Sequence, residues 1–359
     1  MSARVTMQDI ADSLGLSRNT VSKAFNNTGV IAESTKEIIL RKAAEMGYKN
    51  LAVGAVPESI PAASSRKEIA MLTCFMPGGS HFAVTTIDRM QQNLSSRGYS
   101  LTFYRVTSSE LSELRLPGSF RTDNVAAIFC MELFSYEYCE MLCTLDIPLL
   151  FIDAPIKPGH TPLHADTLLM ENQAGIYTLI SQIARQGKHS VGFVGDMFHC
   201  RSFFERASAC ITAAAIYGLN PVEPFSIPSF PPSKKPIKPA SYLNYSDRVY
   251  NALQNMPKLP EVFICANDFI AINLISSLRR MDIHCPDDIL VMGFDDSPES
   301  RYHAPALTTV HIHTQILGDI ASELLLSRIA DPAREPRTVY VPTEFILRES
   351  TQIKKKTSE

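Results

Sequence analysis

The chain contains no tryptophan, no unbroken apolar stretch near the roughly 18 residues that a membrane-spanning helix needs, and no cysteine pair with the C-x-x-C spacing. The missing apolar stretch predicts a protein without a membrane segment. The amino terminus also lacks the apolar core of a secretory signal, so we expect a cytoplasmic protein. The eight cysteines lie mostly within apolar runs, which favours buried thiols over a disulfide scaffold or a zinc site.

The chain also has little net charge, −3 over 359 residues, but that charge is unevenly distributed. Residues 1–50 carry seven Lys and Arg against five Asp and Glu, a balance of +2 that leaves −5 for the rest. A modestly basic end on an acidic body is typical of a protein that contacts nucleic acid with that end alone. Because a single core stops growing at roughly 250 to 300 residues, the length predicts two or three folded units.

The first 46 residues have the pattern of three short helices. Thr6 is predicted to cap the first helix and Gly15 to end it. Ser17 is predicted to cap a second helix over residues 18–25, and Ser34 to open a third. The apolar positions expected to form one small core are Ile10, Ala11, Leu14, Val21, Ala24, Phe25, Ile38, Ile39, Ala43 and Met46.

This pattern has the geometry of a helix-turn-helix, in which an apolar helix and a glycine turn precede a helix with a polar outer face. Arg18, Asn19 and Lys23 fall in the first half of that second helix, where side chains can reach base edges in the major groove. Arg and Lys can donate to the acceptors of guanine, and Asn can pair with adenine through two hydrogen bonds. We therefore expect this segment to bind double-stranded DNA.

The motif Ile10-Ala-x-x-Leu-Gly-x-Ser-x-x-Thr-Val-Ser, followed by Asn26 and Ala32-Glu-Ser-Thr35, resembles the DNA-binding headpiece of the lactose-repressor family. The resemblance implies a homodimeric transcription regulator, in particular a repressor, that binds a near-palindromic operator. Carried over by position, the residues that read bases are Arg18, Asn19 and Lys23. The residues that the resemblance assigns to phosphate contacts are Thr6, Ser17, Thr20, Ser22 and Asn26.

Residues 49–67 are rich in Gly, Pro and Ser and are predicted to form a linker. Members of the family have a hinge helix here, Asn-x-x-Ala-Arg-x-Leu, whose Leu enters the minor groove. In this chain Gly54 takes the place of the Arg, and Val56, followed by Pro57, that of the Leu. The lower helix propensity favours a flexible tether over a hinge helix, and Val56 as a smaller wedge is the alternative.

Beyond the linker, short apolar runs alternate with helical patterns, which is typical of parallel sheets covered by helices on both faces. Two such series predict two doubly wound lobes, with a ligand in the crevice at the carboxyl ends of the strands. The strands are expected at 69–75, 101–106, 125–131, 149–152, 191–194, 262–265 and 289–294. The helices are expected at 84–97, 173–185, 203–217, 269–281 and 315–330, the last as a dimer, lobe-packing or ordinary core element.

The predicted boundaries follow from these patterns. The helix-turn-helix unit covers residues 1–48, the linker 49–67, the effector-binding core 68–352 and a tail 353–359. Within the core, we expect an N-lobe at 68–157 and 312–330 and a C-lobe at 158–311 and 331–352. The fold class is therefore an N-terminal all-α headpiece plus an α/β core of two doubly wound parallel-sheet lobes.

The core resembles the periplasmic sugar-binding fold of the same family in Glu171-Asn-Gln-Ala-Gly175, Cys265-Ala-Asn-Asp268 and the run from Pro286 to Asp296. The resemblance implies a small-molecule effector, a sugar or related metabolite. The effector contacts that it implies are His81, Phe82, Asp153, Arg206, Asn267 and Asp295. Arg201 is the alternative to Arg206, because the residues after Arg206 depart from the family pattern.

Other roles are open for these positions. Asn267 and Asp295 end strands and can instead cap helices or bind turn amides, and Asp268 is expected to cap the helix that follows it. No nucleophile with a base partner and no metal-spaced His cluster accompanies the paired carboxylates, so we predict no catalytic residues, cofactor or metal. The alternative function is that of a soluble ligand-binding protein with a weakened DNA role.

Overall fold

A computed structural model of the chain describes residues 6–26, 32–46, 68–74, 81–222 and 245–352. The chain divides into two compact units, Met1–Arg66 and Lys67–Glu359, which are treated separately below. The predicted linker and the predicted tail both lie outside the described residues.

The described residues of the first unit form three helices: α1 (Met7–Leu14), α2 (Arg18–Asn26) and α3 (Glu33–Glu45). Thr6 caps α1 as predicted, because its hydroxyl accepts from the backbone N–H of Asp9 and the Asp9 carboxylate accepts from that of Thr6. Gly15 ends α1 with φ of 64°, a conformation that costs glycine little. The core of this unit is formed by Ile10, Ala11, Val21, Ala24, Ile39 and Ala43.

One residue of the expected core is placed elsewhere. Ile38 is 44% exposed, while the next residue, Ile39, is fully buried. Adjacent helix positions are about 100° apart, so only one of the two can face the other helices. The side chains of Phe25 and Ser34 lie outside what the structure describes.

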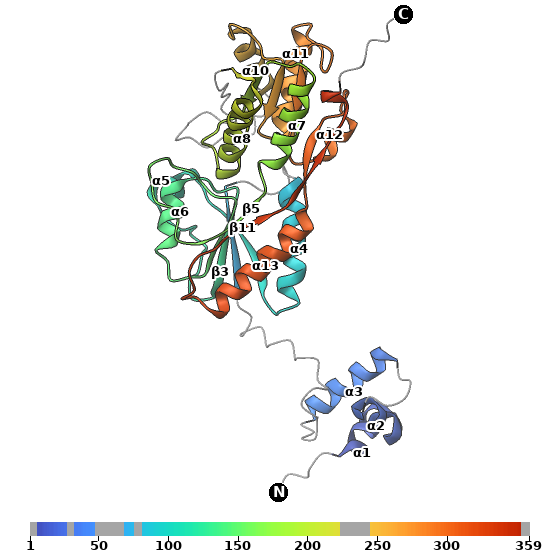
Figure 1. Cartoon of the computed structure of the whole chain (residues 1–359). Helices are drawn as coiled ribbons and strands as arrows, with labels where there is room; N and C mark the ends of the chain where they lie inside the picture. Colours follow the sequence, from blue (N-terminus) through green and yellow to red (C-terminus); the bar gives the residue numbers. More distant parts are fainter. Residues whose placement is uncertain (1–5, 27–31, 47–67, 75–80, 223–244, 353–359) are drawn as a thin grey trace, which may run out of the picture. The chain divides into compact units, whose positions relative to one another are not determined.

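The N-lobe of the second unit is built on a six-stranded parallel sheet with the order β11-β5-β4-β3-β1-β2. Its strands are β1 (Glu68–Thr73), β2 (Ser100–Arg105), β3 (Val125–Met131), β4 (Leu149–Ile152), β5 (Asp166–Met170) and β11 (Thr338–Val341). Helices α4 (His81–Ser95) and α13 (Thr314–Ala330) pack side by side on one face (Figure 1). Helices α5 (Ser108–Glu113) and α6 (Tyr136–Cys143) cover the other face.

The C-lobe contains a four-stranded parallel sheet with the order β7-β6-β8-β9. Its strands are β6 (Ser190–Val194), β7 (Asn220–Pro221), β8 (Val262–Cys265) and β9 (Leu290–Met292). The helices among its described residues are α7 (Ala174–Arg185), α8 (Arg201–Tyr217), α10 (Tyr245–Gln254), α11 (Asp268–Arg280) and α12 (Pro298–Tyr302), with α7 packed on α8 and α10 on α11. Two parallel sheets with helices on their faces confirm the predicted fold class.

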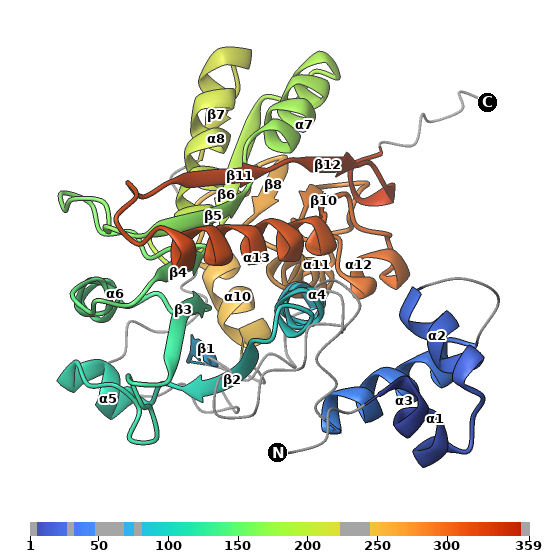
Figure 2. The ribbon, with the colours of Figure 1, turned by 90° about the horizontal axis from the view of Figure 1, so that it is seen from below.

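A separate antiparallel pair, β10 (Thr309–Ile312) with β12 (Thr343–Ile346), completes the core before the short helix η3 (Glu349–Thr351). Figure 2 shows β11 and β12 following one another across the core. The predicted lobe boundaries were wrong in one respect. Strands β5 and β11 belong to the N-lobe sheet, because β5 pairs with β4 and β11 pairs with β5, whereas both had been assigned to the C-lobe.

The buried Asp166 explains why β5 and β11 stay in the N-lobe. Its carboxylate accepts hydrogen bonds from Nε and Nη2 of Arg328 at 3.0 and 2.9 Å and from the backbone N–H of Arg337 at 2.8 Å. Burial alone would raise the pKa of Asp166, but Arg328 and Arg337 lower it on balance. The start of β5, the end of α13 and the start of β11 are thereby held together.

Candidate functional site

The second helix of the headpiece exposes the side chains that were predicted to read DNA. Arg18, Asn19 and Lys23 are exposed on α2, while Val21 and Ala24 of the same helix are buried. The polar face of α2 therefore points away from the headpiece core. The long, charged donors on that face can approach base edges without losing any internal partner that the structure shows.

Two of the hydroxyl groups predicted to hold phosphates, those of Thr6 and Ser17, cap helices. The Ser17 hydroxyl accepts from the backbone N–H of Thr20 at 3.1 Å and shares a 2.8 Å hydrogen bond with the Thr20 hydroxyl. Ser17 is thus confirmed as a cap of α2. Thr6 and Ser17 are exposed, and Thr20 and Ser22 are half-buried. The side chain of Asn26 lies outside the described residues.

A cavity of about 1040 Å³ lies in the core where the carboxyl ends of the two sheets meet. It is lined by segments that follow β3, β4, β6 and β9, by the first turns of α4, α8 and α11, and by α12. Its polar lining residues are Glu132, Asp153, His199, Ser202, Arg206, Asn267, Asp268, Asn273, Asp295, Ser297, Glu299 and His303.

Five of the six predicted effector residues line this cavity: Phe82, Asp153, Arg206, Asn267 and Asp295. The sixth, His81, begins α4, and its side chain lies outside the described residues. The fold brings these positions together although they are more than 200 residues apart in sequence. Asp153 follows β4 directly, Asn267 is the second residue after β8, and Asp295 is the third residue after β9.

Helix α8 places the two candidate arginines differently. Arg206 lines the cavity and is only 3% exposed. Arg201 instead pairs with Glu205 at 3.0 Å and donates to the Tyr340 hydroxyl at 3.0 Å. Of the two, Arg206 alone lines the cavity.

The guanidinium of Arg206 is held on several sides. Its Nε donates to Oδ1 of Asn172 at 3.0 Å and its Nη1 to the carbonyl of Ala266 at 2.6 Å. Its Cζ lies 3.4 Å from the centre of the Phe294 ring, and its Nη1 is 3.8 Å from Oδ1 of Asp295. Burial lowers the pKa of Arg206, and Asp295 opposes that shift.

Three acidic residues that line the cavity have unusual backbone conformations, with positive φ angles. Glu132, Asp153 and Asp295 have φ values of 54°, 58° and 110°, and each follows a buried apolar segment. Non-glycine residues rarely adopt positive φ, and such positions cost of order 1 to 3 kcal/mol each. This strain is concentrated at one edge of the sheets, which is the edge that lines the cavity.

Two of the acidic groups in the cavity hold protons unusually tightly. Burial raises the pKa of Asp295 to about 7, and nearby Arg206 limits the rise. Burial and then the charge of Asp295 raise the pKa of Asp268 to about 8, although hydrogen bonds from Thr309 and Ser297 favour its ionised form. Both groups can therefore donate as well as accept hydrogen bonds near neutral pH.

The expected role of Asp268 was wrong. Asn267, the residue before it, caps α11, because its Oδ1 accepts from the backbone N–H of Ile270 at 3.0 Å. Asp268 is the first helical residue, and its carboxylate turns to accept from the Thr309 hydroxyl at 2.6 Å and the Ser297 N–H at 2.8 Å. It thereby joins α11 to β10 and to the loop that carries Asp295.

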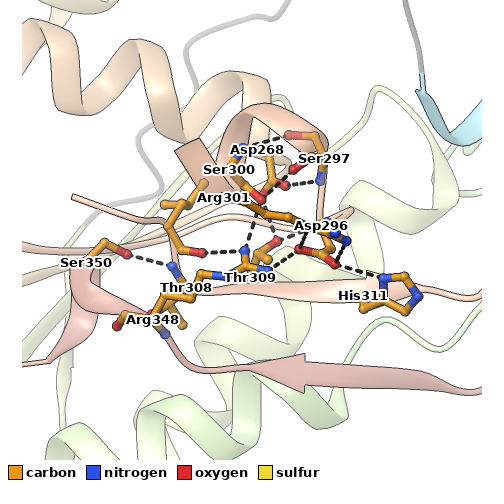
Figure 3. Close-up of polar contacts among 11 residues, drawn as sticks. Asp268, Asp296, Ser297, Ser300, Arg301, Thr308, Thr309, His311, Arg348 and Ser350 are labelled. Atoms are coloured by element: carbon orange, nitrogen blue, oxygen red, sulfur yellow. Dashed lines mark hydrogen bonds and ion pairs between the residues drawn. The ribbon is translucent and has the colours of Figure 1, made fainter. Parts of the chain in front are cut away.

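Asp296 fixes the same loop from its other side (Figure 3). Its buried carboxylate accepts from Nη2 of Arg301 at 2.6 Å and Nη2 of Arg348 at 2.5 Å, and it lies 2.9 Å from Nδ1 of His311. Burial alone would raise the pKa of Asp296, but these three partners lower it on balance. The loop that carries Asp295 is therefore held by the hydrogen bonds of the two residues that follow it, Asp296 and Ser297.

Sequence reasoning missed several lining residues. Glu132 follows the apolar run 125–131 directly, so the strand-end argument applied to Asp153 would also have found it. Phe203, Phe269 and Tyr302 lie on helices, and Tyr302 is 88% exposed although it lines the cavity. Their direction depends on how each helix packs, which the sequence pattern does not specify.

Within the described residues, no cluster of three or more His, Cys, Asp or Glu side chains is arranged to bind a metal ion. No helix among the same residues is long and apolar enough to cross a membrane.

Two family profiles match the sequence. Residues 6–50 match the profile of bacterial regulatory proteins of the lacI family, and residues 180–351 match the periplasmic binding protein-like domain. The chain is 27% identical over 355 residues to the HTH-type transcriptional repressor PurR of Vibrio campbellii, covering 97% of this chain and 98% of the relative. It is 25% identical over 352 residues to the protein of that name from Photobacterium profundum, with the same coverage.

Solved structures share the fold over the whole length. The complex of the transcriptional regulator CelR with cellobiose matches 97% of this chain and 100% of its own, with a TM-score of 0.65 and 19% identity. The lac repressor dimer bound to operator and the anti-inducer ONPF matches 97% and 99%, with a TM-score of 0.64 and 17% identity. These matches confirm the predicted combination of a helix-turn-helix headpiece with a periplasmic-binding-protein-like core.

Proposed function

Because this chain belongs to the lacI family of bacterial regulatory proteins, we propose that it is a transcriptional repressor whose operator affinity is set by a small molecule in the core cavity. The observation that carries the proposal is that a helix with an exposed reading face and a cavity lined by Arg206 and Asp295 occur in one chain. Because members of this family are transcription regulators, the chain is a regulator rather than an enzyme.

On the DNA side, residues 1–48 form the binding unit, and two headpieces of a cytoplasmic homodimer contact half-sites about one helical turn apart. Arg18, Asn19 and Lys23 read bases, as their exposure on α2 supports. The proposed phosphate contacts are Thr6, Ser17, Thr20, Ser22 and Asn26. A helix cap leaves hydroxyl lone pairs and protons available, so the capping roles of Thr6 and Ser17 are compatible with this assignment.

On the ligand side, residues 68–352 form the effector-binding core, and the effector is a neutral sugar or related polyol. Among the described residues, the cavity lining contains one guanidinium, that of Arg206, against the five carboxyl groups of Glu132, Asp153, Asp268, Asp295 and Glu299. All five groups can form hydrogen bonds with hydroxyl groups, and those that are ionised repel phosphates and other anions. The proposed contacts are His81, Phe82, Asp153, Arg206, Asn267 and Asp295, with Phe82 offering an apolar face.

A thermal-shift screen of the full-length chain tests the ligand. The panel pairs neutral sugars with their phosphates, for example glucose with glucose 6-phosphate, and adds amino acids and nucleobases. A specific ligand at 100 times its Kd stabilises the fold by about 2.7 kcal/mol, which raises the melting temperature measurably. We expect a neutral sugar to shift the transition and its phosphate to fail, and stabilisation by the phosphate alone would contradict the charge argument.

Nucleobases are the second candidate class, because Phe82, Phe203 and Phe269 line the cavity and a planar ring can pack against them. The same screen separates the two classes directly.

Selection of bound sequences from random duplex DNA tests the other half of the proposal. We expect enrichment of a near-palindromic site, with equal affinity for selected and random DNA as the contradicting result. That result, combined with a stabilising ligand, would favour a ligand-binding protein with a weakened DNA role.

A further inference from the structure

Arg206 is the last member of a chain of hydrogen bonds that leads out of the cavity. Its Nε donates to Oδ1 of Asn172, and Nδ2 of Asn172 donates to Oε2 of Glu205 at 2.8 Å. The other carboxylate oxygen of Glu205 accepts from the Tyr340 hydroxyl at 2.6 Å. Asn172, Glu205 and Tyr340 do not line the cavity, so their bonds reach a ligand only through Arg206.

The direction of every bond in this chain is determined by Glu205. A carboxylate only accepts, so the neighbouring amide of Asn172 must turn its NH₂ group toward Glu205. The carbonyl oxygen of Asn172 then faces Arg206, whose Nε–H can only donate. With Nε and Nη1 occupied in this way, Nη2 of Arg206 makes no hydrogen bond to any described residue.

The chain of bonds also connects the two lobes. Glu205 and Arg206 lie on α8 of the C-lobe, and Tyr340 lies on β11 at the edge of the N-lobe sheet. Asn172 lies between β5 and α7, where the chain passes from one lobe to the other. Asn172 and Arg206 are buried, and Tyr340 is partly exposed. The Tyr340 bond therefore depends on the relative position of the lobes.

We propose that Glu205 and Tyr340 are positioning residues of the effector cavity, which orient Arg206 through Asn172 and make that orientation depend on the position of the lobes. The proposal rests on the proposed function in one respect, namely that Arg206 contacts the effector. The orientation of Arg206 itself can be tested without any ligand.

The first experiment measures hydrogen exchange of the Arg206 Nε–H by ¹⁵N NMR on the full-length chain, with the resonance assigned by its loss in Arg206→Lys. In Glu205→Gln the amide oxygen stays at the Oε1 position, because Arg201 Nε and the Tyr340 hydroxyl both donate there. Its NH₂ group then faces the NH₂ group of Asn172, so either a donor is left against a donor or Asn172 flips and loses its bond to Arg206. We expect exchange at least about tenfold faster than in the parent, since a buried bond to a charged donor is lost. Unchanged protection would overturn the proposal.

A second substitution provides the rescue. Glu205→Gln combined with Asn172→Asp reverses the donor and acceptor between the two positions, so the amide of one donates to the carboxylate of the other. The carboxylate at position 172 still accepts from Arg206. We expect slow exchange to return in the double variant, and a general loss of packing would not be restored in this way. Failure of the rescue alongside a native melting temperature would contradict the proposed polarity.

Tyr340→Phe and its matched control separate the lobe contact from the loss of a hydroxyl. Tyr104 donates to Oε1 of Glu68 at 2.7 Å, the same pair of groups, but both residues lie within the N-lobe sheet. We expect Tyr340→Phe to speed exchange of the Arg206 Nε–H several-fold and Tyr104→Phe to leave it unchanged. Equal effects of the two variants would mean that the lobe contact does not orient Arg206.

The ligand-binding experiment uses the compound that raises the melting temperature most in the screen of sugars, sugar phosphates, amino acids and nucleobases. We expect Glu205→Gln to weaken its binding about tenfold, the loss of one well-oriented hydrogen bond, while the melting temperature without ligand stays within a few degrees. If exchange responds as expected but affinity does not, the positioning chain exists and the assignment of Arg206 as an effector contact fails. If neither responds, the positioning proposal itself fails.

Discussion

The headpiece and the core use arginine in opposite surroundings. Arg18 is exposed on α2, whereas Arg206 is 3% exposed and is bonded to Asn172 and Ala266. An exposed arginine keeps its water until the partner arrives, so it loses hydration and side-chain freedom on binding. A buried arginine has lost both on folding, and the fold has compensated for the loss with fixed partners.

This difference explains how the two recognition surfaces can serve different ligands. DNA carries closely spaced negative charges, and attraction to them offsets the free-energy cost of ordering exposed side chains. These contacts are salt-dependent. A small molecule offers few contacts, so its affinity depends on groups that are already oriented. Charged residues in the core should therefore affect stability, while those on α2 should affect binding and leave stability unchanged.

The largest expected effect is on a buried core carboxylate. Asp166→Ala leaves Arg328 and Arg334 without their shared partner, and breaking a buried pair in this way costs about 3 to 5 kcal/mol. The control is Asp12→Ala on the headpiece surface, where Gln8 is the one side chain among the described residues that donates to the carboxylate. The loss there should stay within about 0.5 kcal/mol. Urea unfolding of the full-length chain measures both. A similar loss for the two variants would remove the contrast between core and headpiece.

The next largest effect is expected on operator binding, with no change in the stability of the headpiece. Arg18→Ala should weaken operator binding by about 1 to 3 kcal/mol and relax the preference at one base pair, because a contact to a base edge is lost. The urea midpoint of the headpiece should not change, since Arg18 is exposed. Arg97→Ala, an exposed arginine of the core, is the control and should leave operator binding unchanged. Titrations against selected and random duplexes distinguish loss of a base contact, which affects the selected site alone, from loss of general electrostatic attraction.

Much of the fold could be predicted from local pattern. Strands β3, β4 and β8 have the predicted bounds, because each is an apolar run that is buried on both faces. Strand β5 was not predicted, and its residues were assigned to the C-lobe instead of the N-lobe. It begins with Asp166, whose burial makes sense only with Arg328, a partner 162 residues away that no local pattern shows.

The candidate site was predictable to the extent that strand ends define it. Asp153 and Asp295 follow strands or apolar runs, and both line the cavity as expected. The choice between Arg201 and Arg206 could not be made in this way, because both lie on α8 and differ by about 140° in direction around it. Which of them faces the cavity depends on the packing of α8 against the sheet, and that packing is a property of the whole lobe.

The smallest effect concerns a proton held inside the core. The carboxyl of Asp268 keeps its proton up to pH about 8 in the folded chain, whereas an unfolded Asp loses it near pH 3.9. Between these values the folded state binds more protons, so this group makes stability fall as pH rises. Burial lowers the pKa of His199 and gives the opposite slope below about pH 6.5, so the test is made between pH 7 and 8. Asp268→Asn can keep the bonds to Thr309 and Ser297 but cannot titrate, so its stability should fall less steeply, by about 1 kcal/mol per pH unit. Asp287→Asn, at an exposed carboxyl, should retain the parent slope, and an unchanged slope in Asp268→Asn would mean that this buried group is ionised throughout.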